Sequence, residues 1–474
     1  CLCLCWRWKI VRMGKGNLQR TPRVLGKLLS WDKQSRVKEG LYHFQRAEGL
    51  GKTRLHLRVD PDGTGTLVIN ASSILHLNPT AALIAFHHLE GSDPAAIQSK
   101  IKGAFRGAPS DFLQEIQLII KDLESFISAD GKPVNTYSGI EINSPYSHHP
   151  SAPYRMDLAL TYQCNNDCPH CYNARARTYP ELSTKDWKEI IDQLWQLNIP
   201  HLIFTGGEPT LRDDLVELIA YAEQKGQITG LNTNGRRLSD QDFLDKLVDA
   251  GLDHVQITIE SHNPKVHNQM VNRQGAWQQS IAGLKNSLAS SLYVMTNTTM
   301  LQNNRSSLDE TLDFLGQLGV PTVGLNALIY AGKGKEVGTG LREEELKPIL
   351  ELAQRKTLEQ DQKLIWYTPT LYCYFNPLEM GLGIKGCTAA LYNMCIEPDG
   401  GVIPCQSYYQ QLGNLLQDPW KSIWEHDLAL HLRKRKYVPD GCQTCSLLEE
   451  CGAGCPLAYA DHPREVKPVI PPAS

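Results

Sequence analysis

The chain has 474 residues, of which 41% are hydrophobic and 21% are charged, and this length predicts two or three folded domains. No apolar run is long enough to cross a membrane, and a net charge of −3 with mixed signs disfavours nucleic acid and anionic membrane surfaces as partners. We therefore expect neither a membrane protein nor a nucleic-acid-binding protein.

The 14 cysteines are unevenly spread along the chain. Three lie before residue 6, three lie between Cys164 and Cys171, and eight lie between Cys373 and Cys455. A disulfide framework is typical of small secreted domains. Cysteines in C-x2-C spacings within a large chain instead indicate metal ligands in a reducing compartment, and they predict a cytoplasmic protein.

Residues 1–50 are predicted to be a poorly ordered N-terminal segment, because they are polar and basic without a sustained hydrophobic period. The first dozen residues are too short, and too interrupted by Arg and Lys, to form a secretory signal. We expect Met13 to be the true start of the protein, and no role is assigned to Cys1, Cys3 and Cys5.

Residues 51–130 are predicted to form a small winged-helix-like α+β domain. A hairpin is indicated by two alternating segments, 55–60 and 66–70, on either side of a Pro-Asp-Gly-Thr-Gly turn. Three helices are predicted after it, near residues 78–90, 93–105 and 110–127. The first two begin with Asn-Pro and Asp-Pro, which are start signals for a helix. The third carries acidic residues that disfavour contact with DNA phosphates, namely Asp111, Glu115, Asp122 and Glu124.

The stretch from Leu67 to Ala81 in this domain resembles the PqqD-like peptide-recognition chaperone of pyrroloquinoline quinone biosynthesis. The resemblance implies a domain that binds a leader peptide as an extra strand beside its hairpin, with backbone hydrogen bonds for affinity and side-chain pockets for selectivity. The alternative is a purely structural cap. Residues 131–153 are rich in Ser, Pro and Gly, and they are predicted to be a linker.

Residues 154–345 alternate between segments typical of strands and segments typical of helices. Strands are predicted near residues 156–162, 201–205, 227–232, 254–259, 293–299 and 322–326. Helices are predicted near residues 183–197, 213–225, 239–250, 277–287 and 307–318. These repeats predict an α/β fold with a parallel sheet curved into a partial (β/α)6 barrel of the TIM type, in which ligands bind at the carboxyl ends of the strands.

Three cysteines follow the first predicted strand of this barrel in a C-x3-C-x2-C spacing, and they are Cys164, Cys168 and Cys171. Three thiolates on one loop can hold three corners of a four-iron cluster and leave one iron open to a ligand. The alternatives are a zinc site, which usually closes with four ligands, or cysteines that only pack in the interior.

Other chemically useful side chains follow the next three predicted strands. The second strand ends in Gly206-Gly207-Glu208-Pro209, where paired glycines allow a close backbone approach and the carboxylate is an acceptor for an ammonium group. The third strand ends with Thr233 and Asn234, which suit ribose or carboxylate, and the fourth ends near Glu260. Each could be an ordinary turn, but their order places all of them on one rim of the barrel.

Together, the cysteine loop and the Gly-Gly-Glu-Pro segment resemble the paired marks of the radical S-adenosylmethionine (SAM) enzymes. The resemblance implies a [4Fe–4S] cluster on the three loop cysteines, with SAM chelated to the open iron. It also implies that residues 206–209 hold the amino end of SAM, with ribose and carboxylate contacts from Thr233, Asn234 and Glu260. Reductive cleavage of SAM then gives a 5′-deoxyadenosyl radical that abstracts a hydrogen atom from the substrate. The residue before the third cysteine is usually aromatic in this family, and here it is His170.

The eight later cysteines carry a second resemblance. Cys387 is followed by Ile396-Glu-Pro-Asp-Gly400 and Cys405, and then by a C-x2-C-x5-C-x3-C pattern that ends at Cys455. Residues 346–474 therefore resemble the SPASM extension, which carries auxiliary iron–sulfur clusters in enzymes that modify peptides and proteins. The resemblance implies one or two auxiliary [4Fe–4S] clusters.

The same resemblance assigns the auxiliary ligands by position. The first cluster would be bound by Cys387, Cys405 and Cys455, and Cys395 is a candidate for its fourth ligand. The second would take Cys442, Cys445 and Cys451. The family closes the second cluster with a further cysteine, and this sequence has none after Cys455, so Asp461 or His462 replaces it or the site stays open or incomplete. Cys373 lies before the pattern and is more typical of a buried thiol than of a ligand, although a catalytic or ligand role is an open alternative.

The combination predicts a radical SAM/SPASM oxidoreductase or maturase that oxidatively modifies a ribosomally made peptide or a protein, for example by a thioether or carbon–carbon crosslink. The expected partners are the precursor itself and an electron donor such as flavodoxin or ferredoxin. One alternative is the same chemistry on a small molecule in cofactor or porphyrin biosynthesis. Another is a non-catalytic iron–sulfur electron carrier or leader-binding adaptor. The residues do not identify a catalytic acid, base or radical relay.

Overall fold

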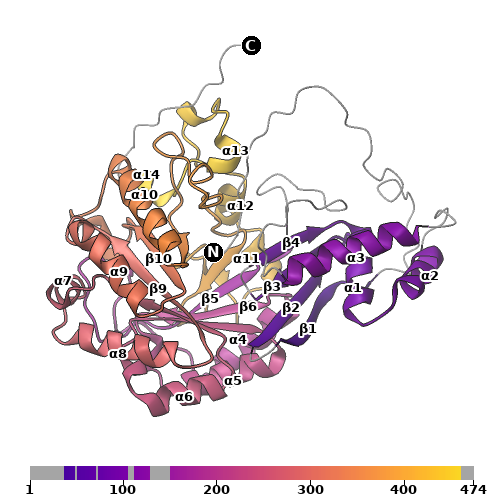
Figure 1. The fold of residues 1–474 in the computed structure, drawn as a ribbon, viewed down its shortest axis with the longest axis horizontal. Coiled ribbons are helices and arrows are strands. Elements are labelled where there is room, and N and C mark those ends of the chain that lie inside the picture. Colours follow the sequence, from indigo (N-terminus) through magenta and orange to yellow (C-terminus); the bar gives the residue numbers. More distant parts are fainter. Residues whose placement is uncertain (1–36, 49–50, 71–72, 105–111, 129–149, 461–474) are drawn as a thin grey trace. The chain divides into compact units, whose positions relative to one another are not determined.

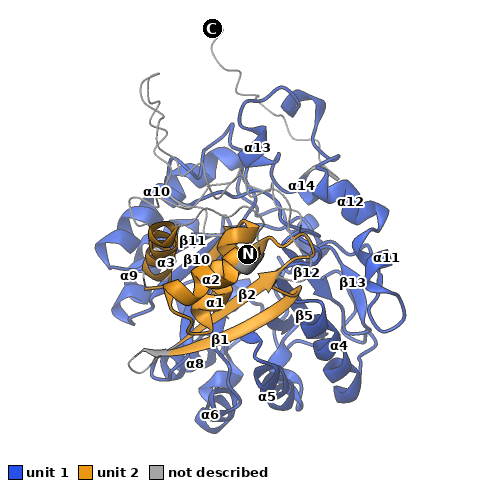
Figure 2. Ribbon diagram, turned by 90° about the vertical axis from the view of Figure 1, so that its right-hand side faces the viewer, with its two compact units in different colours: residues 1, 150–474 blue, residues 2–149 orange. Residues whose placement is uncertain are grey.

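The computed structural model describes residues 37–48, 51–70, 73–104, 112–128 and 150–460. The chain divides into two compact units, one within residues 2–149 and one that begins at residue 150 (Figure 2). Each unit has its own hydrophobic core. None of the helices in the described part of the chain has the length and apolar content that crossing a bilayer requires.

The N-terminal unit contains a four-stranded antiparallel sheet whose strands follow one another in chain order. The strands are β1 (Gly40–Glu48), β2 (Gly51–Val59), β3 (Gly65–Ile69) and β4 (Ser73–Leu77). Three helices follow, namely α1 (Pro79–Leu89), α2 (Pro94–Ala104) and α3 (Leu113–Ser128). Leu57 and Leu67 of the sheet belong to the same buried cluster as Leu123 and Phe126 of α3. This cluster forms because β2 and α3 each present an apolar face.

The predicted hairpin and all three predicted helices of this unit are confirmed. The side chain of Asn78 caps α1 by accepting a hydrogen bond from the Ala81 backbone N–H at 2.9 Å, as the Asn-Pro start signal predicts. The prediction of a poorly ordered segment up to residue 50 is wrong for Gly40–Glu48. This segment pairs with β2 along its whole length, because a long partner strand supplies hydrogen bonds that the weak local pattern does not reveal.

The unit that begins at residue 150 is built on parallel strands that alternate with helices, and the strands form a curved sheet (Figure 1). The strands of the partial barrel are β5 (Arg155–Thr161), β6 (His201–Gly206), β7 (Ile228–Thr233), β8 (His254–Thr258), β9 (Tyr293–Met300) and β10 (Thr322–Ala327). Six strands were predicted here, and each lies within two residues of its predicted position.

The helices between these strands cover the outside of the sheet. They are α4 (Thr184–Gln196), α5 (Leu215–Lys225), α6 (Gln241–Asp249), α7 (Pro264–Met270), α8 (Ala276–Leu288) and α9 (Leu308–Gln317). Leu158 and Phe204 of the strands are fully buried in one core with Trp187 and Leu194 of α4. The core forms because strands that are buried on both faces meet the apolar stripes of amphipathic helices.

The cysteine-rich region continues the same sheet. After α10 (Glu343–Glu359) and β11 (Lys363–Trp366), strand β12 (Asn393–Ile396) pairs in parallel with β5, and it is followed by β13 (Gly401–Ile403) and β14 (Gly413–Asn414). The sheet therefore has ten strands in the order β11-β10-β9-β8-β7-β6-β5-β12-β13-β14. Short helices complete the region, namely α11 (Trp420–Trp424), α12 (Asp427–Arg433), α13 (Leu448–Cys451) and α14 (Leu457–Ala460).

The boundary predicted between the barrel and the cysteine-rich region, at residues 345 and 346, falls inside helix α10. The pairing of β12 with β5 joins the two regions into one sheet, so they do not separate into independent sheets. Pairing across so many residues leaves no trace in the local pattern from which the boundary was predicted.

Candidate functional site

The loop from Cys164 to Cys171 follows β5 directly, at the carboxyl end of the first barrel strand. Burial raises the pKa of the Cys168 thiol well above its usual value, and the neighbouring charges of Cys171, Glu260 and Cys164 raise it further. Burial also raises the pKa of Cys164, to about 11. Thiols that resist ionisation on their own ionise when a metal stabilises the thiolates, which is the condition that an iron–sulfur cluster meets.

Two arginines hold the backbone of this loop. Arg177 donates to the carbonyl oxygens of Cys164 and Asn166, the second at 2.5 Å. Arg236, from the segment after β7, donates to the Asn165 carbonyl at 2.6 Å and to the Asn166 side chain at 3.0 Å. Because these carbonyls are tied from two sides, the thiols lie on a fixed frame rather than on a freely moving loop.

The Gly-Gly-Glu-Pro segment crosses the end of β5 at very close range. The Gly207 N–H donates to the Thr161 carbonyl at 2.7 Å, and the Glu208 N–H donates to the Gln163 carbonyl at 2.8 Å. A Cβ on Gly206 would collide with the Thr161 carbonyl oxygen, and one on Gly207 would collide with the Gln163 carbonyl oxygen. Glycine is therefore required at both positions, so that the two strand ends can approach each other.

Glu208 is completely buried and connects two loops of the rim. One carboxylate oxygen accepts hydrogen bonds from the hydroxyls of Thr210 and Thr233, both at 2.7 Å. The other accepts from the Asn234 backbone N–H at 2.8 Å. Because a carboxylate oxygen has two lone pairs, this second oxygen retains the capacity to accept from an ammonium group. Burial raises the pKa of Glu208, and the hydrogen bonds oppose that shift.

The remaining rim candidates also contact the cysteine loop. The Asn234 side chain donates to the Asn165 side chain at 2.6 Å. Glu260, at the end of β8, is buried; it contacts His170 at 3.0 Å and accepts from the Thr299 backbone N–H at 2.9 Å. The predicted rim residues are thus brought together around the cysteine loop. The contact between His170 and Glu260 was not predicted, because no local signal connects residues on different strand ends.

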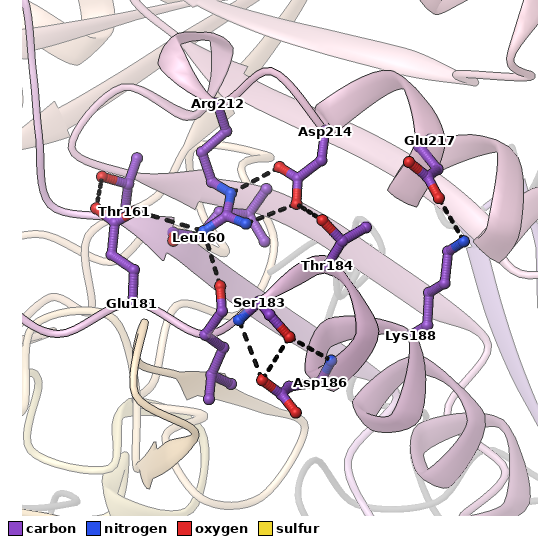
Figure 3. Close-up of polar contacts among 11 residues, drawn as sticks. Leu160, Thr161, Glu181, Ser183, Thr184, Asp186, Lys188, Arg212, Asp214 and Glu217 are labelled. Carbon is purple, nitrogen blue, oxygen red and sulfur yellow. Dashed lines mark hydrogen bonds and ion pairs between the residues drawn. The ribbon is translucent and has the colours of Figure 1, made fainter.

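Figure 3 shows how the segment after Pro209 is attached to β5. Arg212 donates to both carboxylate oxygens of Asp214, at 2.8 and 2.6 Å, and to the Leu160 carbonyl at 3.3 Å. Asp214 also accepts from the Thr184 hydroxyl at 2.7 Å, in the first turn of α4. Because its side chain is only 12% exposed, Arg212 acts as an interior brace that fixes the glycine segment to the strand end.

Comparison with known proteins identifies the family to which this rim belongs. Residues 158–315 match the family model of the radical SAM superfamily, and residues 387–446 match that of the SPASM iron–sulfur cluster-binding domain. The chain therefore contains a radical SAM domain and a SPASM domain. Its cofactors are SAM and [4Fe–4S] clusters, which the two domains imply.

Curated relatives of this radical SAM enzyme differ in substrate. The Fe-coproporphyrin III synthase of Methanosarcina barkeri is 29% identical over 62% of this chain and 80% of its own. The PqqA peptide cyclase of Rhizobium meliloti is 28% identical over 64% of this chain and 82% of its own. Because one name refers to a porphyrin and the other to a peptide, sequence identity at this level does not assign a substrate.

Solved structures show the fold. SuiB of Streptococcus suis, crystallised with its precursor peptide SuiA, has a TM-score of 0.64 and 16% identity, covering 86% of this chain and 95% of its own. The enzyme anSMEcpe, crystallised with SAM and a peptide, has a TM-score of 0.52 and 17% identity, covering 67% of this chain and 92% of its own. The likeness confirms a radical SAM fold with a SPASM region.

The cysteines of the SPASM region fall into two groups. Burial raises the pKa of Cys387, and the neighbouring charges of Cys455 and Cys405 raise it further. The second group contains Cys442 and Cys451, and the charge of Cys445 adds to the burial of Cys442 in raising its pKa. The assignment of these cysteines to two clusters stays a prediction. Among the described residues, no three His, Cys, Asp or Glu side chains are close enough to hold a single metal ion, so contacts and charges define the groups.

Three further residues are ligand candidates for the auxiliary clusters. Cys395, the candidate fourth ligand of the first cluster, lies on β12 and is 1% exposed. It packs in an apolar cluster with Ala159, Tyr162 and Ile403, and the charge of Cys405 is only a minor contributor to its raised pKa. The alternative ligands Asp461 and His462 lie outside the described residues.

A short hydrogen-bonded path joins the cysteine loop to the SPASM region. Tyr172 directly follows Cys171, and its hydroxyl donates to the Gln406 side chain at 2.7 Å. Gln406 directly follows Cys405 and donates to Asp157 of β5 at 2.8 Å. A single hydrogen bond thus connects Tyr172, which follows a predicted ligand of the SAM-binding cluster, with Gln406, which follows a predicted ligand of an auxiliary cluster.

An ion pair between a partly exposed arginine and a buried glutamate strengthens the same junction. The Arg175 guanidinium donates to both carboxylate oxygens of Glu397, at 2.6 and 2.9 Å, and it lies between the rings of Tyr179 and Tyr409. Glu397 is completely buried and also accepts from the Tyr162 hydroxyl at 3.2 Å. A bidentate pair of this kind fixes orientation as well as distance, so it sets the angle between the cysteine loop and the SPASM hairpin.

Proposed function

We propose that this enzyme oxidatively modifies a ribosomally synthesised precursor peptide or a protein in the cytoplasm. The observation that carries the proposal is the extent of the likeness to SuiB, whose crystal structure contains a precursor peptide. Coverage of 86% of this chain exceeds the unit that begins at residue 150, so the likeness extends into the N-terminal unit. The presence of that unit favours a macromolecular substrate.

The N-terminal sheet is suited to binding an extended peptide. Its order, β1-β2-β3-β4, makes β1 and β4 the two edge strands, and within the described residues each pairs with a single neighbour. An edge strand offers unpaired backbone N–H and C=O groups to a peptide that adds as a further strand. We propose that the leader of the precursor binds here, in the PqqD-like manner, and that residues 131–153 link this unit to the enzyme.

The cysteine loop supplies the initiating site in this proposal. Cys164, Cys168 and Cys171 hold the SAM-binding cluster, which supplies one-electron cleavage of SAM and so a 5′-deoxyadenosyl radical when it is bound and reduced. Residues 206–209 would hold the methionine amino group of SAM, for which Glu208 has an acceptor site remaining. Thr233, Asn234 and Glu260 orient the carboxylate and ribose.

The SPASM region has a separate role in the proposal. Cys387, Cys405 and Cys455 hold one auxiliary cluster, and Cys442, Cys445 and Cys451 contribute to a second. The Arg175–Glu397 pair keeps these groups at a constant orientation to the barrel rim. Such clusters would accept the electron that is left after hydrogen abstraction, and an electron donor such as flavodoxin or ferredoxin would supply the reducing electron at the start.

The test combines two readouts on anaerobically reconstituted enzyme. With SAM, reductant and a deuterated candidate precursor, we expect 5′-deoxyadenosine that carries deuterium and a precursor whose mass falls by hydrogen loss. The Cys168→Ala variant is the control and should give neither product. Formation of 5′-deoxyadenosine without deuterium from any tested peptide, together with no peptide binding to the N-terminal unit, would overturn the peptide proposal.

A second candidate function is radical chemistry on a porphyrin. It is favoured by the Fe-coproporphyrin III synthase and by the AdoMet-dependent heme synthase of the same organism, which is 26% identical over 65% of this chain and 93% of its own. These matches span about the length of the unit from residue 150. Deletion of residues 1–149 separates the candidates, because a porphyrin-modifying enzyme should keep its activity while a leader-dependent enzyme should lose it.

A further inference from the structure

The second auxiliary group of thiols has a neighbour on a distant segment of the chain. After β11, a turn closes where the Tyr374 N–H donates to the Leu371 carbonyl at 3.0 Å, and Cys373 lies within this turn. It forms no disulfide. The sequence pattern of the SPASM region begins only at Cys387, and it therefore gives Cys373 no part in a cluster.

Direct contacts place this turn against Cys451. The Tyr372 backbone N–H donates to the Cys451 sulfur at 3.4 Å, and the Cys451 thiol donates to the Thr370 carbonyl at 3.5 Å. The segment just beyond α13 also packs here, because a Cβ on Gly454 would meet the Leu371 side chain at 3.5 Å. The backbone that immediately precedes Cys373 thus lies on the sulfur of a predicted ligand.

The effect of the Cys373 charge on the pKa of its neighbours agrees with a position of Cys373 near Cys451. Burial is the main cause of the raised pKa of Cys442, and the charge of Cys373 comes next, ahead of that of Cys445. For Cys451, the charge of Cys373 contributes ahead of that of Cys442. The contacts of Cys451 with Tyr372 and Thr370 thus bring the turn that carries Cys373 to this group, although Cys373 is 69 residues before Cys442 in the chain.

We infer that Cys373 is the fourth ligand of the auxiliary cluster held by Cys442, Cys445 and Cys451. Four cysteine thiolates are the usual ligand set of a [4Fe–4S] cluster, and this set would leave no iron of that cluster open. A closed cluster can pass electrons but cannot bind a substrate atom. The inference depends on the iron–sulfur cofactors of the SPASM domain and not on the identity of the substrate.

The test measures cluster content in the full-length enzyme without any substrate. In a Cys168→Ala background, which removes the SAM-binding cluster, only the auxiliary clusters contribute iron and electron paramagnetic resonance signals. We expect Cys373→Ala to lower the iron content by up to about four atoms per chain, or to replace the signal of one auxiliary cluster by a different one. Cys442→Ala should change the same signal.

Double variants separate ligation from general damage. Cys373→Ala combined with Cys442→Ala should lose no more iron than Cys442→Ala alone, whereas Cys373→Ala combined with Cys387→Ala should lose the iron of both groups. Cys373→Ser keeps the volume of the side chain and should give the altered signal at an unchanged melting temperature. Retention of the parent iron content and spectrum by both Cys373 variants would overturn the inference, whatever the outcome of the peptide assay.

Discussion

Two parts of the unit that begins at residue 150 gather cysteines, and they do so differently. The loop from Cys164 to Cys171 places three thiols within eight consecutive residues, immediately after one strand. The auxiliary groups collect theirs from segments that lie between Cys373 and Cys455, separated by strands and short helices. The first site is therefore determined by local spacing, and the second depends on the tertiary fold of the SPASM region.

The two parts also differ in what supports them. Arg177 and Arg236 hold the cysteine loop through its backbone carbonyls, so the loop is braced by its own barrel. The SPASM hairpin is fixed by the pairing of β12 with β5 and by the ion pair between Arg175 and the buried Glu397. We therefore expect substitutions in the cysteine loop to affect the cleavage of SAM. Substitutions at the junction should instead affect the cysteine loop and the SPASM region together.

The largest expected effect comes from removing one thiol from each part. Cys168→Ala should reduce 5′-deoxyadenosine formation to background and remove about four irons per chain, because the SAM-binding cluster loses a ligand. Cys387→Ala should remove a similar amount of iron but leave SAM cleavage measurable while precursor modification is lost. Iron analysis and chromatography of the nucleoside products check both variants. Equal loss of SAM cleavage in the two variants would contradict a separation of roles.

Breaking the junction should have the next largest effect. Glu397→Gln leaves the Arg175 guanidinium without its buried charged partner, which should lower the free energy of unfolding by about 3 kcal/mol. Asp399→Asn, on the same hairpin but partly exposed, is the matched control and should cost less than about 1 kcal/mol. Urea unfolding of the two variants and the parent measures the difference. If both substitutions had the same small effect, the ion pair would not hold the two parts together.

A pH effect should arise at the barrel rim. His267 is buried, its Nδ1 accepts from the Glu260 backbone N–H at 3.2 Å, and burial lowers its pKa to about 4. The unfolded chain binds this proton near pH 6.5, so stability should fall as the pH drops below that value, by about 2 kcal/mol at pH 5. His267→Gln should lose this part of the pH dependence. Unfolding midpoints at pH 7 and pH 5 for both proteins test it, and equal slopes would exclude a contribution from His267.

The smallest effect is expected for the hydrogen bond between the cluster-bearing segments. Tyr172→Phe removes the donor to Gln406, which should cost about 1 kcal/mol and reduce coupling by roughly fivefold. The ratio of modified precursor to 5′-deoxyadenosine measures this coupling, while uncoupled SAM cleavage serves as the internal control. A ratio as low as that of Cys387→Ala would mean that the tyrosine does more than orient its neighbours.

Local patterns predicted most of the barrel because its information is local. Each βα repeat carries its own hydrophobic period and its own start signals, such as the capping box in which Ser183 and Asp186 bond each other at the start of α4. The glycines of the rim were likewise recognisable, because Gly206 and Gly207 are needed for a backbone approach that no other residue permits.

The features that sequence reasoning missed depend on pairs of distant residues. Arg175 and Glu397 are 222 residues apart, and nothing in the neighbourhood of either indicates the other. Strand β1 was missed because its order comes from β2, and Cys373 was set aside because it precedes the recognisable pattern. In each case the deciding interaction is tertiary, and a single sequence gives no measure of it.

The pairing of β5 with β12 also has a consequence for synthesis of the chain. Strand β5 is made early, but its second neighbour emerges only about 240 residues later, which takes on the order of tens of seconds during translation. Throughout that time the nascent barrel presents an apolar strand with an open edge, and such edges recruit other strands. Chaperone demand should therefore last until residue 396 has left the ribosome, and iron loading of the auxiliary groups should follow only after that point.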